Sequence, residues 1–432
     1  MKKALIVSYA FPPNAAVGTY RILKFCKYLP EFGWEPVVLT IENPRNTLID
    51  KSLLDELHEG LRVYRAPKWS FSRPNGNGQT PLHASNGHRP GLWKKAIGKL
   101  TETVSIPDRH FNWILPAVTK GLEISKREGF DVIFSSSPPN SGHVAAYLLS
   151  RLTGKPFVVD LRDLWMLNES HELRAWPVWR RWLESSLERQ ILLRSRGVIT
   201  ASPGFTSRIR TSYPKKPTEL FHTITNGLDP ADFSHLAESR SKNDKFTILH
   251  LGSLYGLRRP EPFFATLARW VQETPSIKNR IRVRFLGHVP PELIEITDPT
   301  LRSIVSFEEP VPHREALLSL WEADLLLLLL GYTDSSTGVI PAKLFDYIAS
   351  RCPILAYVPD GEAARLVERY RAGFVVRDPA SNDGLKYLAR AYERWLKGNG
   401  HERKAAFIPP ELHRRNLTLQ LASVLDGVAN GN

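Results

Sequence analysis

The feature that most constrains this chain is a regular alternation of short apolar runs with longer segments of helical spacing. The runs cover residues 4–10, 36–40, 61–66, 131–137, 156–163, 197–202, 246–253, 281–287, 303–309, 324–330, 352–358 and 373–376. Near-continuous apolar strands are buried on both faces, and strands that alternate with helices form parallel sheets. The sequence therefore predicts an α/β fold with two doubly wound domains and a boundary within residues 230–244.

Length and composition agree with two folded domains. The chain has 432 residues, of which 42% are hydrophobic, and this excludes a disordered or fibrous protein. The two cysteines, Cys26 and Cys352, form no disulfide framework and have no neighbouring ligand at metal spacing. The longest apolar run, 325–330, is too short to span a bilayer. We therefore predict a cytoplasmic protein, at most peripheral on the inner face of the cell membrane.

The formal net charge of +14 lies almost entirely in the first half of the chain. Residues 1–220 hold 32 Lys and Arg against 19 Asp and Glu, whereas the remainder is nearly balanced. Such an excess fits an anionic membrane surface or a nucleic acid. Because no aromatic–basic pattern or zinc-ligand spacing accompanies the charge, the sequence favours an anionic membrane surface or acceptor and predicts no nucleic-acid partner.

Residues 70–100 interrupt the alternation. The first part, 70–91, is rich in Gly, Pro, Asn and Ser and predicts a mobile loop. The second part, 92–100, is basic and partly amphipathic. It is either a membrane-surface contact or an ordinary solvated helix, and the residues do not decide between the two.

Ligands of doubly wound sheets bind beyond the carboxyl ends of the strands, so residues at those ends are the first candidates. Gly18 follows the first strand and allows either a structural turn or close approach of a substrate. His143 follows the fourth strand and is a candidate for orienting a sugar hydroxyl, although a lone His there is more often structural. Arg162 and Asp163 end the fifth strand, where Arg162 either binds a ligand or forms a structural ion pair, and Asp163 is better placed to reach a substrate.

The first strand of the second half leads into a loop that contains Gly252, Ser253, Arg258 and Arg259. Gly252 lets the backbone approach a ligand closely, and the arginines supply fixed positive charge. Arginines in loops are usually solvated, but these follow a strand at a glycine turn. That combination suits a diphosphate.

The strongest local pattern follows the longest apolar run, where a Ser-Thr-Gly loop leads through Gly338 and Val339 into a helix near Pro341. Backbone N–H groups at a helix N-terminus bind anions. Lys343 adds a cation in the first turn, which the helix dipole disfavours unless an anion is bound. Asp346 lies on nearly the same face and can accept hydrogen bonds from a ribose diol. The plain alternative is a Lys–Asp surface pair.

Together these segments resemble the retaining, GT-B-fold glycosyltransferases of family 4, and more narrowly the bacterial polysaccharide type. The resemblance rests on FPPNAAVGTYR, SSPPNSGHVAA, VVDLRDLW, ITNGLDP, LHLGSLYGLRRPEPF and GVIPAKLFDYIASRCPILAYVPDG. It implies two Rossmann-like domains that face a central cleft. Residues 1–230 would bind the acceptor, residues 231–405 the nucleotide sugar, and a helix within 406–432 would cross back to the first domain.

The resemblance also implies the chemistry. A sugar would move from a UDP- or GDP-type donor to a hydroxyl of a glycan or lipid-linked acceptor, with retention, in cell-surface glycan assembly. No metal or cofactor is expected, because basic side chains and a helix N-terminus neutralise the leaving diphosphate. The implied donor contacts are Gly18, Asn226, Gly252, Ser253, Arg258, Gly338, Val339, Lys343 and Asp346. The implied catalytic residues are Asp163, Arg258 and Lys343, and the implied acceptor or sugar contacts are Arg162, Asp163 and His143.

The sequence departs from the family pattern at two places. Ala15 and Ala16 fill part of the first glycine run, and Gly338 stands where a glutamate is expected eight residues before Asp346. These departures leave the donor sugar open. Four alternatives also remain: a transferase acting on a soluble small acceptor, a GT-B nucleotide-sugar epimerase, a phosphorylase, and a basic membrane- or nucleic-acid-binding protein without catalysis.

Overall fold

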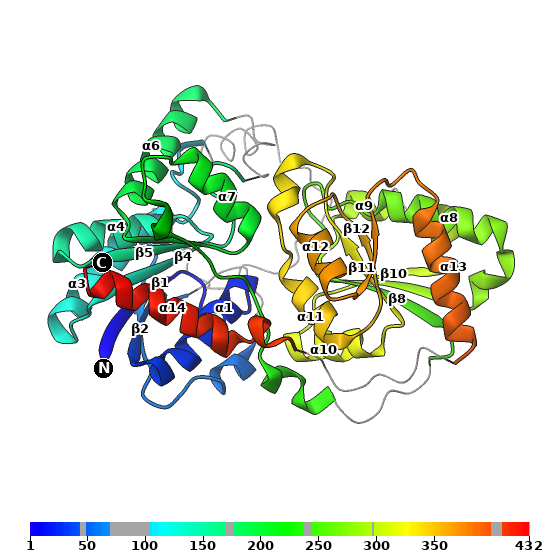
Figure 1. Ribbon diagram of the computed structural model, residues 1–432, viewed down its shortest axis with the longest axis horizontal. Coiled ribbons are helices and arrows are strands. Elements are labelled where there is room, and N and C mark those ends of the chain that lie inside the picture. The colour runs from blue at the N-terminus through cyan, green and yellow to red at the C-terminus, as the bar shows by residue number, and fades with distance from the viewer. Residues whose placement is uncertain are drawn as a thin grey trace, which may run out of the picture. The chain divides into compact units, whose positions relative to one another are not determined.

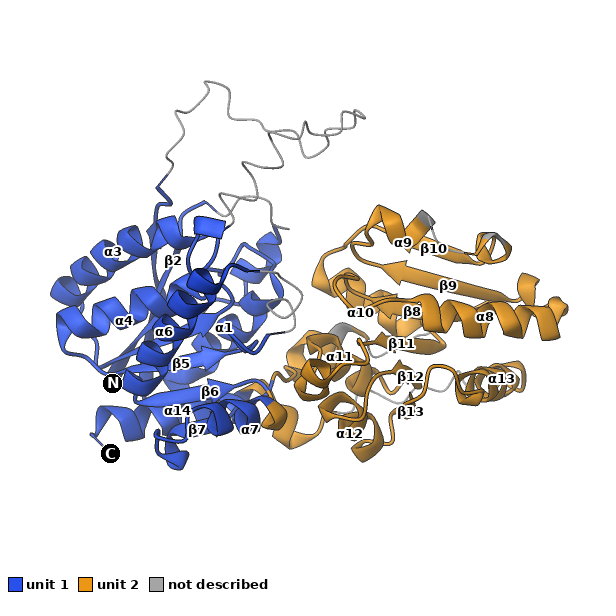
Figure 2. Cartoon of the chain, turned by 90° about the horizontal axis from the view of Figure 1, so that it is seen from above, with its two compact units in different colours: residues 1–201, 205–225, 415–432 blue, residues 202–204, 226–414 orange. Residues whose placement is uncertain are grey.

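The computed structural model describes residues 1–43, 49–69, 103–168, 176–236, 243–295, 298–398 and 408–431. The chain divides into two compact units, shown in different colours in Figure 2. Unit 1 comprises Met1–Ala201, Phe205–Thr225 and Arg415–Asn432, and unit 2 comprises Ser202–Gly204 and Asn226–Arg414. The segment 70–100, predicted to form a mobile loop and a basic segment, lies outside the described residues.

Unit 1 contains a seven-stranded parallel sheet with the order β3-β2-β1-β4-β5-β6-β7 (Figure 1). Its strands are β1 (Lys2–Ser8), β2 (Trp34–Ile41), β3 (Arg62–Ala66), β4 (Val132–Ser137), β5 (Phe157–Leu161), β6 (Gly197–Thr200) and β7 (Phe221–Thr223). The sequence analysis missed only β7, because its three residues form no apolar run. The α-helices of this part are α1 (Val17–Tyr28), α3 (Ile114–Arg127), α4 (Ser141–Thr153), α6 (Val178–Arg194), α7 (Pro203–Ser212) and α14 (Arg414–Ala429).

The last helix packs on the first sheet, as predicted. Leu417, Leu421 and Leu425 of α14 join one buried cluster with Ile6 of β1 and Phe25 of α1. Since side chains alternate across a strand, the neighbouring residues of β1 point to the other face of the sheet, where α3 and α4 lie against each other (Figure 1). The C-terminal helix is therefore part of the core of unit 1.

Unit 2 contains a six-stranded parallel sheet with the order β10-β9-β8-β11-β12-β13. Its strands are β8 (Phe246–Leu251), β9 (Ile281–Leu286), β10 (Val305–Glu308), β11 (Leu325–Leu329), β12 (Ile354–Tyr357) and β13 (Gly373–Val376). Its α-helices are α8 (Glu261–Glu273), α9 (Pro291–Glu295), α10 (His313–Glu322), α11 (Ala342–Ser350), α12 (Glu362–Arg369) and α13 (Asp383–Leu396).

The central strand β11 shows why the apolar runs are continuous. Leu325, Leu327 and Leu329 belong to a cluster completed by α8 and α13, while Leu326 and Leu328 belong to one completed by α10, α11 and α12. Every residue of the strand is therefore covered by a helix on one side or the other. The α/β prediction with two Rossmann-like sheets is confirmed. Among the described residues, no helix combines the length and the apolar character needed to traverse a bilayer.

Candidate active site

The candidate site of unit 2 is built around Lys343 in the first turn of α11. Its Nζ lies 2.9 Å from Nε2 of His250, near the end of β8. Nδ1 of His250 lies 3.0 Å from the carbonyl oxygen of Leu327 in β11. If Nδ1–H donates to that carbonyl, Nε2 is left as the acceptor for the lysine ammonium. Two neighbouring strands thus fix the direction of one lysine at the carboxyl edge of the sheet.

The environment of Lys343 disfavours its positive charge. Burial and the charge of Arg258 hold the pKa of Lys343 well below its ordinary range. Burial and the charge of Lys343 also hold the pKa of His250 well below its ordinary range, so this imidazole is neutral. An anion beside Lys343 would offset both effects by favouring the ammonium form. A negatively charged ligand beside Lys343 would therefore be favoured by these surroundings.

The two loop arginines differ in their partners. Nε of Arg259 donates to a carboxylate oxygen of Glu261 at 2.8 Å, and the two side chains are 51% and 36% exposed. Arg258 instead lies over the ring of Tyr255, with Cζ 4.3 Å from the ring centroid. Among the described residues Arg258 has no carboxylate partner. Of the pair, Arg258 is therefore the cation available to a ligand.

The loop backbone comes close to the lysine. Gly252 has a φ of +97°, and a Cβ built there would lie 3.5 Å from Nζ of Lys343. Other residues disfavour this backbone conformation, and a side chain would occupy space beside the ammonium group. Ser253 follows and is half-buried. The glycine thus keeps the approach to the lysine open.

The N-terminus of α11 carries the remaining predicted donor contacts. Pro341 precedes the helix, and no side chain caps it. Gly338 is buried, with its carbonyl oxygen accepting a hydrogen bond from Ser202 Oγ, and Val339 is half-buried. Asp346 lies 3.9 Å from Nε2 of His313. Lys343 contacts His250 rather than this aspartate, so the Lys–Asp surface pair is not what the structure shows.

In unit 1, Arg162 lies at the carboxyl ends of the strands. Its Nε donates to the carbonyl oxygen of Ser137 at 2.8 Å, and Nη2 donates to that of Pro138 at 2.6 Å. A Cβ built on Gly18 would overlap Nη1 of Arg162. Gly18 is therefore required for the arginine to lie against the start of α1, while its predicted contact with a donor stays a prediction. Burial lowers the pKa of Arg162.

Asp160, two residues before Arg162, is paired with a different arginine. Asp160 accepts hydrogen bonds from Nε and Nη2 of Arg21 at 3.0 and 2.8 Å, and a third from Ser136 Oγ at 2.7 Å. Arg21 also donates to the carbonyl oxygens of Ile224 and Thr225. This fully buried pair links α1 to β4 and β5, and Arg21 also holds the segment that follows β7. Arg162 is thereby left without a bidentate carboxylate partner among the described residues.

Three further predicted residues lie in different surroundings. Asp163 is exposed beyond the end of β5, and Asn226 is half-buried at the first residue of the second stretch of unit 2. His143 is fully buried, and its Nδ1 lies 2.8 Å from Ser135 Oγ. Burial lowers the pKa of His143 to about 3, so it is neutral. The structure places His143 in the interior beside Ser135, and its contact with a sugar hydroxyl stays a prediction.

Sequence reasoning missed two contributors to the site. His250, which directs Lys343, was not among the predicted site residues. Its signal was a histidine within an otherwise apolar strand, two residues before Gly252. Arg21, the partner of Asp160, lies in a helix pattern where an arginine gives no sign of burial.

The first half of the chain matches a known family. Residues 18–227 match the model of the glycosyl transferase 4-like domain. No curated protein sequence matches the chain.

Solved structures match the whole length. HepE from Anabaena, solved in complex with UDP and glucose, has a TM-score of 0.65 at 14% identity, covering 99% of this chain and 100% of HepE. Sucrose-phosphate synthase from Thermosynechococcus elongatus has a TM-score of 0.64 at 14% identity and full coverage of both chains. A glycosyltransferase from Rickettsia africae has a TM-score of 0.56 at 12% identity, covering 100% of this chain and 94% of its own. At these identities the likeness shows the fold, which is GT-B.

Proposed function

We propose that this protein is a glycosyltransferase that moves a sugar from a nucleoside diphosphate donor to a hydroxyl group of an acceptor. The observation that carries the proposal is Lys343, held by His250 beside Arg258 and an uncapped helix N-terminus, in surroundings that disfavour its charge. Two findings support it: the match of residues 18–227 to the glycosyl transferase 4-like domain, and the GT-B fold shared with HepE, which binds UDP and glucose.

In the proposed reaction, unit 2 binds the donor. Lys343 and Arg258 stabilise the negative charge that develops on the leaving diphosphate, and the loops at Gly252 and Gly338 bring backbone close to it. Asp346 accepts hydrogen bonds from the ribose. No metal is needed in this scheme, because the two cations and the helix N-terminus supply the positive charge. The donor is of the UDP or GDP type, and UDP is favoured by the complexes of HepE.

Unit 1 binds the acceptor in this proposal. Asp163 orients the attacking hydroxyl, and Arg162 holds an anionic or polar group of the acceptor. Transfer proceeds with retention, the departing phosphate oxygen taking the hydroxyl proton. The anomeric configuration of the product, read by NMR from the coupling constant of the new linkage, tests this stereochemistry. An inverted product would make Asp163 the first candidate for a general base.

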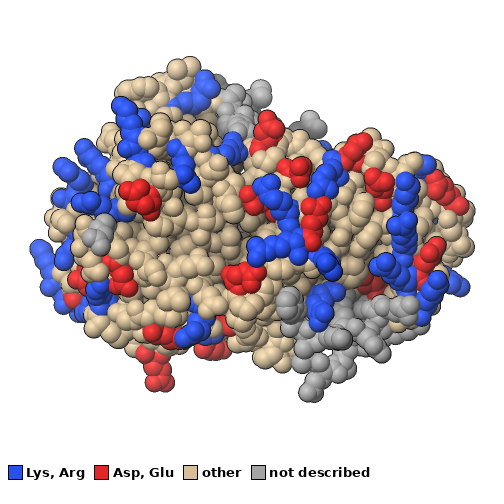
Figure 3. All heavy atoms as spheres, in the orientation of Figure 1, with Lys and Arg blue, Asp and Glu red and all other residues tan. Residues whose placement is uncertain are grey.

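The acceptor class follows from charge. The excess of Lys and Arg in the first half of the chain favours an anionic, lipid-linked acceptor in cell-surface glycan assembly, reached from the inner face of the membrane. Figure 3 shows many Lys and Arg on the left of this face, over unit 1, with some Asp and Glu among them, while both signs are interspersed over unit 2.

A panel of nucleoside diphosphates tests the donor site. We expect UDP or GDP to raise the unfolding temperature of the chain, since a ligand at 100 times its Kd adds about 2.7 kcal/mol of stability. Uridine and guanosine without phosphate are the controls and should shift the transition far less. If none of UDP, GDP, ADP or dTDP shifts the transition, the donor site is wrongly assigned.

The affinity for the nucleoside diphosphate should fall as the pH rises from the depressed pKa of Lys343 in the free protein toward its higher pKa in the complex. A bound diphosphate favours the ammonium form of Lys343, whose pKa in the free protein is depressed, so binding takes up a proton between the free and bound pKa values. Affinity is lost as the pH rises through that window, by at most about tenfold per pH unit for one proton. Calorimetric titrations between about pH 7 and 10, where the phosphate itself is ionised, measure the effect. Lys343→Met should bind weakly with no such slope, and an equal slope in that variant would contradict the assignment.

A further inference from the structure

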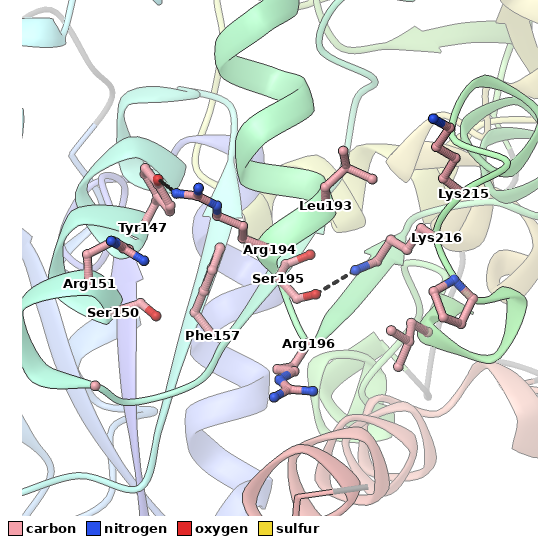
Figure 4. Close-up of a pocket in the computed structure, with 13 residues that line it drawn as sticks. Tyr147, Ser150, Arg151, Phe157, Leu193, Arg194, Ser195, Arg196, Lys215 and Lys216 are labelled. Atoms are coloured by element: carbon pink, nitrogen blue, oxygen red, sulfur yellow. Dashed lines mark hydrogen bonds between the residues drawn. The ribbon is translucent and has the colours of Figure 1, made fainter.

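A pocket of about 610 Å³ lies in unit 1, at the amino-terminal edge of its sheet. The candidate residues of unit 1, such as Arg162, lie at the other edge, where the strands end. It is formed by the end of α4, the end of α6 and the segment before β7, at the amino ends of β5, β6 and β7 (Figure 4). A volume of this size holds a small organic molecule. Nothing in the proposed transfer reaction uses this edge, so the pocket needs a separate explanation.

Five cations line this pocket, which we call the cationic pocket. They are Arg151, Arg194, Arg196, Lys215 and Lys216. No aspartate or glutamate is among the lining residues, and none of the five has a carboxylate partner within the described part of the chain. A concave surface with one sign of charge concentrates ions of the opposite sign.

One of these cations, Lys216, is buried, and its surroundings disfavour its positive charge. Lys216 is 5% exposed, and its Nζ donates to the backbone carbonyl oxygen of Ser195 (Figure 4). Burial and the charge of Arg196 lower the pKa of Lys216 to about 8. An ammonium group has three N–H donors, so the carbonyl contact leaves capacity for a ligand. A bound anion would offset the repulsion that now acts between these cations.

The pocket also has an aromatic side, where Tyr147 is half-buried and Phe157 is only 2% exposed. The rings of Tyr147 and Phe157 lie with their centroids 6.1 Å apart, and the Arg194 guanidinium hydrogen-bonds the Tyr147 hydroxyl and lies 5.8 Å from its ring. Apolar and aromatic walls around a few charged groups are typical of sites for organic ligands rather than for bare ions.

The ordinary explanation for basic residues at this edge is the helix dipole, which favours cations at helix C-termini. It accounts for Arg151 and Arg194, which lie in the last turns of α4 and α6. It also covers Lys216, whose Nζ donates to the carbonyl oxygen of Ser195, the C-cap residue of α6. It does not account for Lys215, which follows the end of α7 by three residues. Nor does it explain why five cations line one pocket with no aspartate or glutamate among them.

We propose that the cationic pocket is a second ligand site, which binds a phosphate group carried by an organic molecule. The cations hold the phosphate oxygens, and the half-buried ring of Tyr147 contacts the organic part. The shared chemistry fits either a soluble phosphate ester or the phosphate of a lipid headgroup. The proposal does not rest on the glycosyltransferase assignment.

The test uses inorganic pyrophosphate and the full chain. All proteins carry Lys343→Met, so that binding at the proposed donor site does not obscure the pocket. The pocket variant adds Arg151→Glu and Arg196→Glu, both exposed, and the matched control adds Lys126→Glu and Arg127→Glu, exposed residues of α3 that do not line the pocket. Both variants change the net charge of the same unit equally.

Calorimetry should show that pyrophosphate binds to the parent. The Kd of the pocket variant should be at least about tenfold higher, and the Kd of the control should lie within about twofold of the parent value. Sedimentation with phosphatidylcholine vesicles, with and without phosphatidic acid, separates the two sources of phosphate. Retention on phosphatidic acid that is lost only in the pocket variant identifies a lipid headgroup, whereas pyrophosphate binding without retention identifies a soluble ester. Equal weakening of the pocket variant and the control, or no binding of either probe, would overturn the proposal.

Discussion

Lys343→Met should lower the turnover of nucleotide sugar about a hundredfold or more, with the protein still folded. The reason is that Lys343 is directed by His250 at the start of a helix and lies beside Arg258, where it can stabilise charge that appears only as the diphosphate leaves. Removal of one such preorganised group costs about 3 kcal/mol of transition-state stabilisation. Methionine keeps much of the length of the lysine side chain and removes its charge. The measurement is kcat and kcat/KM with a UDP-sugar and the acceptor.

The matched control is Lys278→Met, which removes an exposed lysine from the same unit. Its turnover should equal that of the unaltered protein. A turnover of Lys343→Met within about threefold of the unaltered protein, which is less than 1 kcal/mol of barrier, would contradict the diphosphate assignment. Because Lys343 is half-buried and disfavoured as a cation, the variant should also be at least as stable to urea as the parent. A loss of turnover therefore cannot be assigned to unfolding.

The sequence alone anticipated the parts of the site that are local. A Ser-Thr-Gly loop, a proline and a lysine in the next turn are neighbours in the chain, and the structure keeps them together at the start of α11. The same is true of Gly252 and Arg258, which share one loop. Local spacing determines such patterns, so one sequence is enough to find them.

The contacts that orient the side chains of the site could not be predicted from the sequence, because they join residues that are far apart in the chain. Lys343 and His250 are 93 positions apart, and Arg21 and Asp160 are 139 apart. Nothing in either segment indicates which of several charged side chains will meet across the sheet. Asp160 illustrates the point, since its partner Arg21 lies in α1 and not in the neighbouring sequence. The same limit explains His143, whose polar neighbours in the sequence concealed its full burial.

The fold was predicted almost completely, because a strand that is buried on both faces of a sheet has a continuous run of apolar residues. The run 324–330 could be recognised without any knowledge of α8 or α10, since each leucine must be covered by some helix. β7 was missed because an edge strand of three residues is covered on fewer sides and needs no apolar run. Apolar runs in the sequence therefore predict the central strands of a sheet better than its edge strands.

Arg21→Met should lower the free energy of unfolding by several kcal/mol. This substitution leaves the Asp160 carboxylate buried, with one hydroxyl donor from Ser136 and without its hydrogen-bonded cation. Breaking a buried ion pair at one side costs about 3–5 kcal/mol, because the remaining charge is uncompensated. Urea-induced unfolding measures the loss. The control is Arg415→Met, which removes an exposed arginine that pairs with Glu31, and it should cost less than about 1 kcal/mol.

A double variant separates the charge from the packing. In Arg21→Met with Asp160→Asn, the uncharged amide no longer needs a cation, so part of the lost free energy of unfolding should return. The recovery should be incomplete, since the carbonyl oxygens of Ile224 and Thr225 still lack the donors that Arg21 supplies. If the double variant is less stable than Arg21→Met, the arginine acts through its packing against Phe25, over whose ring it lies, and not through Asp160. If Arg21→Met costs no more than Arg415→Met, the buried pair does not hold α1 to the sheet.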